Sequence, residues 1–227
     1  MLALGVFLGL AAAQPAPPPL LANDLFFEEH LANRRSLWSA SPLLSRYPLL
    51  LRTLREQAVP EVRLTADDCV ETMPCHSSIH HELTFAGERL ITVFGEYDGF
   101  HGGAHGSHSV SGHIWDRQLG RMIRVQDLFV DWARAEPILQ AKFCENLRSR
   151  RSDSPDIECP PIADVAVGLS DQSGIPTGGR AYSFELRTSD YQLGSYADGR
   201  ETVWIDAEPD VLALVKPEYR GEFFTFE

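Results

Sequence analysis

Four strand-like segments joined by short connections, between residues 78 and 125, constrain the fold of this chain more than any other feature. Ile91, Val93 and Tyr97 alternate with polar or small neighbours, which indicates a strand with one buried face. Connections this short place successive strands side by side and antiparallel. The sequence therefore predicts an antiparallel meander whose strands cover residues 78–85, 89–97, 107–115 and 121–125.

Helix-like segments lie on both sides of this meander. Residues 24–38 predict a helix capped by Asn23 or Asp24, and Pro48 begins a second helix that Pro60 ends. Two more predicted helices, near 134–151 and 209–215, alternate irregularly with strands near 164–169, 181–187 and 201–205. This mixture predicts an α+β fold, with the meander sheet packed against helices in two intimately packed lobes. The lobes are expected at residues 23–88 and 89–227.

The net charge of the chain limits the kinds of partner that it is expected to bind. The net charge of −12 argues against nucleic acid, because phosphate binding requires clustered Lys and Arg side chains. It also argues against adhesion to an anionic membrane surface. Acidity of this size keeps a protein in solution, and it also steers a basic partner toward an acidic face.

The N-terminus predicts export from the cytoplasm. Residues 1–13 are apolar and small like a signal peptide, and residues 14–22 form a Pro-rich linker. Twelve helical residues span about 18 Å, whereas a bilayer core is roughly 30 Å thick, so no transmembrane segment is expected. The predicted location is periplasmic or secreted.

Four cysteines fit an oxidising compartment. They fall into two local pairs, Cys69 with Cys75 and Cys144 with Cys159, and neither pair has the spacing of a zinc site. Four cysteines allow three pairings, of which the local one is the simplest. A Cys144–Cys159 disulfide would stabilise the fold by about 3 kcal/mol in the chain-entropy view.

Two blocks of sequence carry a resemblance to a known family. Residues 95–129 hold a Gly-Gly-Ala-His turn, a strand that ends in Asp and a Gly turn, and a strand that leads into Asp-Leu-Phe. Residues 191–206 and 216–223 form the second block. Together these motifs resemble the RsiV/PdaC-like extracytoplasmic domain, over roughly residues 90–224.

The resemblance implies a recognition domain of the cell envelope. That family includes the ectodomain of an anti-sigma factor that senses lysozyme, and a non-catalytic domain beside a peptidoglycan deacetylase. The expected partner is a cell-wall glycan or an envelope-acting protein such as a lysozyme, with no cofactor and no catalytic residue. The expected binding surface combines the loops 99–108 and 189–199, with the residues Phe100, His101, Gly102, Gly103, His105, Tyr191, Tyr196 and Asp198.

The histidines support an alternative. Seven of the eight lie between His76 and His113, and His101, His105 and His108 are candidate zinc ligands of a metal-dependent envelope hydrolase or deacetylase. Gly102 and Gly103 disfavour the helix that a shared HxxxH site requires, and His105 can instead hydrogen-bond backbone within a turn. A third possibility is an accessory structural protein of the envelope. Trp115 and Trp204 lie in predicted strands and are expected in the core.

Overall fold

The computed structural model describes residues 22–65, 68–70, 72–152, 157–172, 176 and 178–224. The expected signal peptide at 1–13, and the linker at 14–22 except its last residue, lie outside the described residues. None of the helices in the described part has the length and apolar character needed to cross a membrane.

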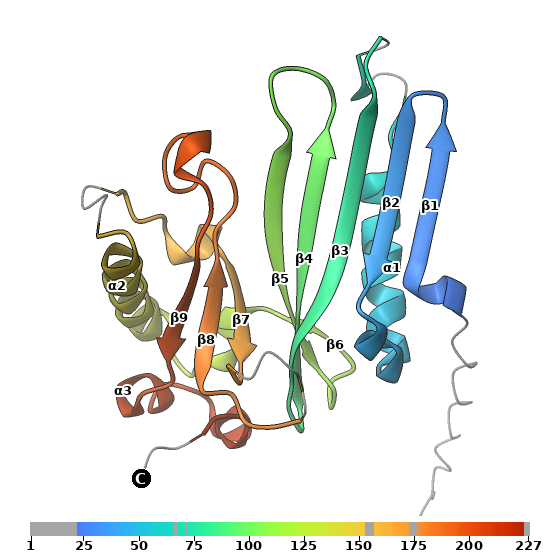
Figure 1. Ribbon diagram of the computed structural model, residues 1–227. Helices are drawn as coiled ribbons and strands as arrows, with labels where there is room; N and C mark the ends of the chain where they lie inside the picture. Colours follow the sequence, from blue (N-terminus) through green and yellow to red (C-terminus); the bar gives the residue numbers. More distant parts are fainter. Residues whose placement is uncertain are drawn as a thin grey trace, which may run out of the picture.

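Two sheets form the framework (Figure 1). The larger runs in the order β1 (Phe26–Leu31), β2 (Arg34–Ala40), β3 (Cys75–Ala86), β4 (Leu90–Phe100), β5 (Ser107–Asp116) and β6 (Arg121–Ile123). The smaller consists of β7 (Ala166–Ser170), β8 (Ser183–Arg187) and β9 (Thr202–Asp206). Strands β3 to β6 pair antiparallel in succession, so the predicted α+β fold with a meander is confirmed.

The prediction of a helix at residues 24–38 is wrong. This segment forms the β1–β2 hairpin, which turns at Ala32 with a positive φ of 53°. In β2 every second residue is buried, the period of a strand, because β2 pairs in parallel with β3 and rests on a helix. That helix, α1 (Pro48–Val62), connects β2 to β3 and continues two residues beyond Pro60, where the prediction ended it. The expected lobe boundary at residue 88 falls in the turn between β3 and β4, inside one sheet.

Each face of the large sheet covers a separate core. On one face, α1 packs against Trp38, Ile79 and Leu83. On the other, the small sheet, α2 (Trp132–Arg150) and α3 (Pro209–Leu212) enclose a core that includes Phe85 and Phe184. A β-bulge between Leu83 and Phe85 adds an extra residue, so that Leu83 lies in the first core and Phe85, two residues later, in the second.

The two sheets approach each other closely at two glycines. A Cβ atom at residue 112 would lie 2.5 Å from Val167 O, and one at Gly168 would overlap the side chains of Thr92 and Phe94. Thr92 Oγ1 also accepts a hydrogen bond from Leu169 N at 3.1 Å. The backbone of β7 therefore lies directly on β4 and β5.

The C-terminal segment locks the far end of the meander. Asp116 is fully buried, and its carboxylate accepts hydrogen bonds from Arg89 Nε at 3.0 Å and from the Tyr219 hydroxyl at 3.0 Å. The backbone N–H groups of Gln118 and Leu119 also donate to it. Burial alone would raise the pKa of Asp116, but these donors outweigh burial and hold that pKa below its ordinary value.

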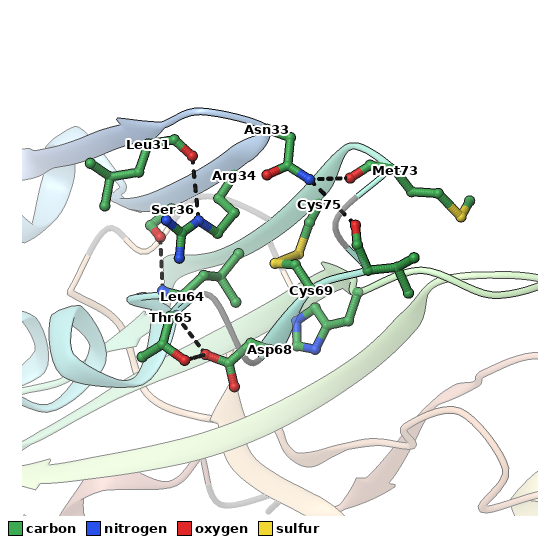
Figure 2. The surroundings of a disulfide bond; sticks show 12 residues. Leu31, Asn33, Arg34, Ser36, Leu64, Thr65, Asp68, Cys69, Met73 and Cys75 are labelled. Carbon is green, nitrogen blue, oxygen red and sulfur yellow. Dashed lines mark hydrogen bonds between the residues drawn. A yellow bond between two sulfur atoms is a disulfide. The ribbon is translucent and has the colours of Figure 1, made fainter.

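Both disulfides join the local pairs, so the simplest pairing is confirmed. Cys144–Cys159 ties α2 to the segment that precedes β7. Cys69–Cys75 ties the loop before β3 to the first residue of that strand, as Figure 2 shows. Asn33 of the β1–β2 turn adds a hydrogen bond from Nδ2 to Met73 O at 2.6 Å, so this loop is held at both ends.

A methyl group at the sheet contact is expected to destabilise the fold. Gly112→Ala places a Cβ atom against the Val167 backbone, which cannot withdraw without moving β7. We expect the free energy of unfolding to fall by about 1–3 kcal/mol, the usual effect of overpacking. Urea unfolding measures this. Gly221→Ala is the matched control, because a Cβ atom there meets nothing within 4 Å, and equal midpoints for the two variants would contradict the proposed contact.

One core histidine has a strongly shifted pKa. His81 is 3% exposed, and its Nδ1 accepts a hydrogen bond from Trp38 Nε1 at 2.9 Å. Burial lowers the pKa of His81 from 6.5 to about 3, and the neighbouring His113 and His80 contribute to this lowering. His81 is therefore neutral in the folded protein at neutral and mildly acidic pH.

This shift predicts a loss of stability in acid. Below pH 6.5 the unfolded chain binds a proton at residue 81 that the folded chain does not bind, so stability falls as the pH is lowered from about 6.5 toward 3. The contribution reaches about 1.4 kcal/mol per pH unit. Urea unfolding between pH 7 and pH 5 should show a shallower decline in His81→Gln than in the parent chain. Leu119→Ala, an exposed substitution that removes no titratable group, should keep the parent slope; a parent slope in His81→Gln would refute the assignment.

Candidate functional site

Two loops that are far apart in the sequence meet at one end of the molecule. His105, in the β4–β5 loop, stacks on Tyr196 with ring centroids 4.2 Å apart. Its Nε2 atom lies 2.9 Å from the Tyr191 hydroxyl. The tyrosine side chains remain open to solvent, at 53% for Tyr191 and 38% for Tyr196. The structure thus brings three of the expected binding residues into one exposed aromatic cluster, which we call the tyrosine surface.

Backbone hydrogen bonds hold the second loop onto β5. His108 N donates to Asp190 Oδ2 at 2.8 Å, and Asp190 N donates to His108 O at 3.2 Å. Val110 N donates to Ser189 Oγ at 2.9 Å. Tyr191 follows with a positive φ of 66°, which turns its side chain away from the strand direction. The position of the tyrosine surface is therefore fixed by β5.

The remaining expected residues have local roles around this cluster. Gly102 and Gly103 adopt φ values of 98° and 113°, which L-residues rarely take, and they shape the turn that carries His105. Asp198 accepts hydrogen bonds from the Ser195 backbone and hydroxyl, and these bonds lower the pKa of Asp198. Phe100 lies at the end of β4 and stacks on the ring of His76.

The expected zinc ligands are not brought together. His101 Nε2 lies 3.2 Å from the Tyr97 hydroxyl, whereas His105 faces Tyr191 and Gly106 O. His108 Nε2 contacts Asp98 instead. Among the described residues, no group of three or more His, Cys, Asp or Glu side chains is arranged to hold a metal ion.

A histidine–carboxylate chain that crosses three strands was not predicted from the sequence. Asp98 on β4 lies between His76 on β3, at 2.6 Å, and His108 on β5. His108 Nδ1 continues the chain to Asp190 Oδ2 at 3.4 Å. Cross-strand pairing sets Asp98 opposite His108, whereas His76 lies diagonally, two residues along β3 from Ser78, the direct partner of Asp98. This series of side chains can be recognised only from the strand register, because its four residues are spread over more than a hundred positions of the sequence.

A cavity of about 430 Å³ lies between the two sheets. Arg187 on β8 lines this cavity, with its side chain 14% exposed. Its Nε donates to Glu185 at 2.7 Å, and its Nη1 contacts Glu82 at 3.2 Å and Glu96 at 2.9 Å. Burial lowers the pKa of Arg187, but these carboxylates outweigh burial and raise it. The cavity is lined by Glu82, Leu83, Thr84, Ser170, Gln172, Glu185, Arg187 and Trp204.

Trp204 departs from its expected place. Its side chain is partly exposed and lines this cavity, whereas Trp115 is buried in the first core as predicted. β9 pairs on only one side, and Arg150 of α2 lies 5.3 Å from the Trp204 ring. A strand pattern alone does not distinguish an inner strand from an edge strand, so the sequence placed this residue in the core.

A second cavity, of about 570 Å³, lies at the β1–β2 turn beside the Cys69–Cys75 disulfide. Four basic side chains line it, His30, Arg34, Arg35 and His76. Glu28 contacts His30 and Arg35 from β1, and Asp98 contacts His76, so acidic groups balance much of this charge.

Comparisons with known proteins concern the fold alone. No family model matches the chain, and no curated protein matches it. A DUF3298 family protein from Pseudomonas aeruginosa superposes with a TM-score of 0.56 at 19% identity, over 85% of this chain and 93% of that one. A DUF3298 family member from Bacteroides fragilis gives a TM-score of 0.49 at 15% identity, over 80% of this chain and 73% of that one. The described chain thus shares the fold of the Pseudomonas DUF3298 protein.

Proposed function

We propose that this chain is an exported cell-envelope recognition domain of the RsiV/PdaC-like kind, which binds a cell-wall component or an envelope-acting protein without catalysing a reaction. The two disulfides support export, because such bonds persist in oxidising compartments. The shared fold with a DUF3298 family protein is consistent with the sequence motifs that suggested the family.

The tyrosine surface carries this proposal. Tyrosine is enriched at binding hot spots because it offers a large, rigid contact area and a hydroxyl at low entropic cost. His105 already holds both rings, one by stacking and the other by a hydrogen bond. Binding therefore costs little further side-chain entropy. A rigid, exposed aromatic cluster of this kind is suited to recognition of a partner.

Loss of the two rings is expected to weaken partner binding. We expect Tyr191→Ala with Tyr196→Ala to reduce affinity for the partner at least tenfold, or about 1.4 kcal/mol, since hot-spot truncations commonly exceed this value. Co-sedimentation with purified peptidoglycan sacculi and calorimetry with a basic lysozyme measure the two partner classes separately.

Leu119→Ala provides the control for this measurement. Leu119 is 49% exposed in the turn between β5 and β6, at the opposite end of β5 from the tyrosine surface. Its removal tests whether any exposed apolar side chain contributes to adhesion. Equal loss in the control and the double variant, or binding to neither probe by the parent chain, would count against the proposal.

A further inference from the structure

The cavity between the sheets presents hydrogen-bond acceptors that the protein itself does not use. Glu185 is 5% exposed, and its Oε1 accepts from Arg187, but within the described part of the chain no donor reaches Oε2. Gln172 directs its Nε2 to Ser183 and Asp206, so its carbonyl oxygen is unengaged by the described residues. The amide of the exposed Gln172 and the carboxylate of Glu185 are therefore acceptors that a ligand carrying hydrogen-bond donors can use.

The backbone at the cavity is also strained. Gln172 has a positive φ of 57°, a conformation that non-glycine residues rarely adopt. Its backbone N–H donates to Ser170 Oγ at 3.1 Å, and the side chain is thereby placed beside the end of β7. Strain of this kind tends to occur where a side chain is held in place for binding.

The charged side chains around the cavity disfavour one class of ligand. Three glutamates, Glu82, Glu96 and Glu185, surround the single guanidinium of Arg187. This excess of carboxylates repels an anionic ligand. The suitable ligand is therefore either neutral or cationic.

The guanidinium of Arg187 already occupies the position that a cationic ligand would take. It contacts all three carboxylates, with its side chain 14% exposed, and it also stacks over Phe94 at 4.2 Å. A cation that entered the cavity would have to lie against this fixed charge. A neutral ligand rich in hydroxyl groups meets no such repulsion.

We propose that this cavity binds an uncharged sugar unit of a glycan. The partly exposed Trp204 offers an aromatic surface for the C–H face of the ring. The carboxylate of Glu185 and the amide of Gln172 accept hydrogen bonds from its hydroxyls, and Ser170 and Thr84 add hydroxyl groups to the wall. A volume of about 430 Å³ lies within the range of small-ligand sites.

This site is separate from the tyrosine surface and rests on the proposed function only for the source of the glycan, the cell wall. Glu82 and Thr84 of the cavity lie on the same strand as His76 and Ser78, which line the cavity at the β1–β2 turn. Alternate residues of a strand project to one face, so a longer glycan could extend along β3 beyond the first sugar.

Calorimetry with defined oligosaccharides tests the proposal. The purified chain is titrated with N-acetylglucosamine tetramer and with maltotetraose, at low and high salt. We expect saturable binding of at least one of them, unchanged by salt because the ligand is neutral. Glu185→Gln, which keeps the size of the side chain and turns one acceptor into a donor, should weaken binding at least tenfold. Trp204→Leu should have a similar effect, whereas Trp204→Phe should retain part of the affinity.

Controls separate this site from the tyrosine surface and from unfolding. Thermal unfolding of each variant identifies any that fail to fold, and Leu119→Ala should bind sugar like the parent chain. Tyr196→Ala should also keep sugar binding even where partner binding is lost, so the two proposals can fail independently. The assignment is overturned if neither oligosaccharide binds, if Glu185→Gln and Trp204→Leu both bind as the parent does, or if pentalysine binds the cavity in a salt-sensitive way instead.

Discussion

Direct contact between the backbones of the two sheets determines most of this structure. Gly112 and Gly168 remove the side chains that would separate β7 from β4 and β5, and Thr92 adds a hydrogen bond across the contact. The second core joins Phe85 of the large sheet to Phe184 of the small sheet and to the buried side of α2. The cavity lies between β3 of the large sheet and β8 and β9 of the small sheet, which Figure 1 shows as separate sheets, and the tyrosine surface joins the β4–β5 loop to the loop 189–199.

Arg187 forms ion pairs with both sheets beside the cavity. A guanidinium that is 14% exposed requires several acceptors, and it obtains them from β3 and β4 of one sheet and from its own strand in the other. These ion pairs connect the two sheets beside the cavity. Glu82, Glu185 and Arg187 also line the cavity, so the same side chains contribute to the cohesion of the sheets and to the polar wall of the cavity.

The sequence predicted what local patterns encode and missed what depends on distant partners. The meander, the α2 helix and both disulfides follow from alternation, helical periodicity and cysteine spacing, and the structure confirms them. Residues 24–38 suit a helix locally, but pairing of β2 with β3 makes them a hairpin. The roles of Asp98 and Arg187 depend on strand register and on sheet packing, which one sequence does not reveal. The two loops were expected at one surface through resemblance, and His105, Tyr191 and Tyr196 do lie together.

The geometry of the tyrosine surface and the geometry of the cavity both depend on how the two sheets pack together. Tyr191 is placed by hydrogen bonds from the 189–199 loop to β5, yet that loop continues from β8 of the small sheet. Any change in the angle between the sheets would therefore pull Asp190 away from His108 and Arg187 away from Glu96 together. Because both contacts cross the same boundary, the packing of the small sheet on the large sheet sets the geometry of the cavity and of the tyrosine surface together.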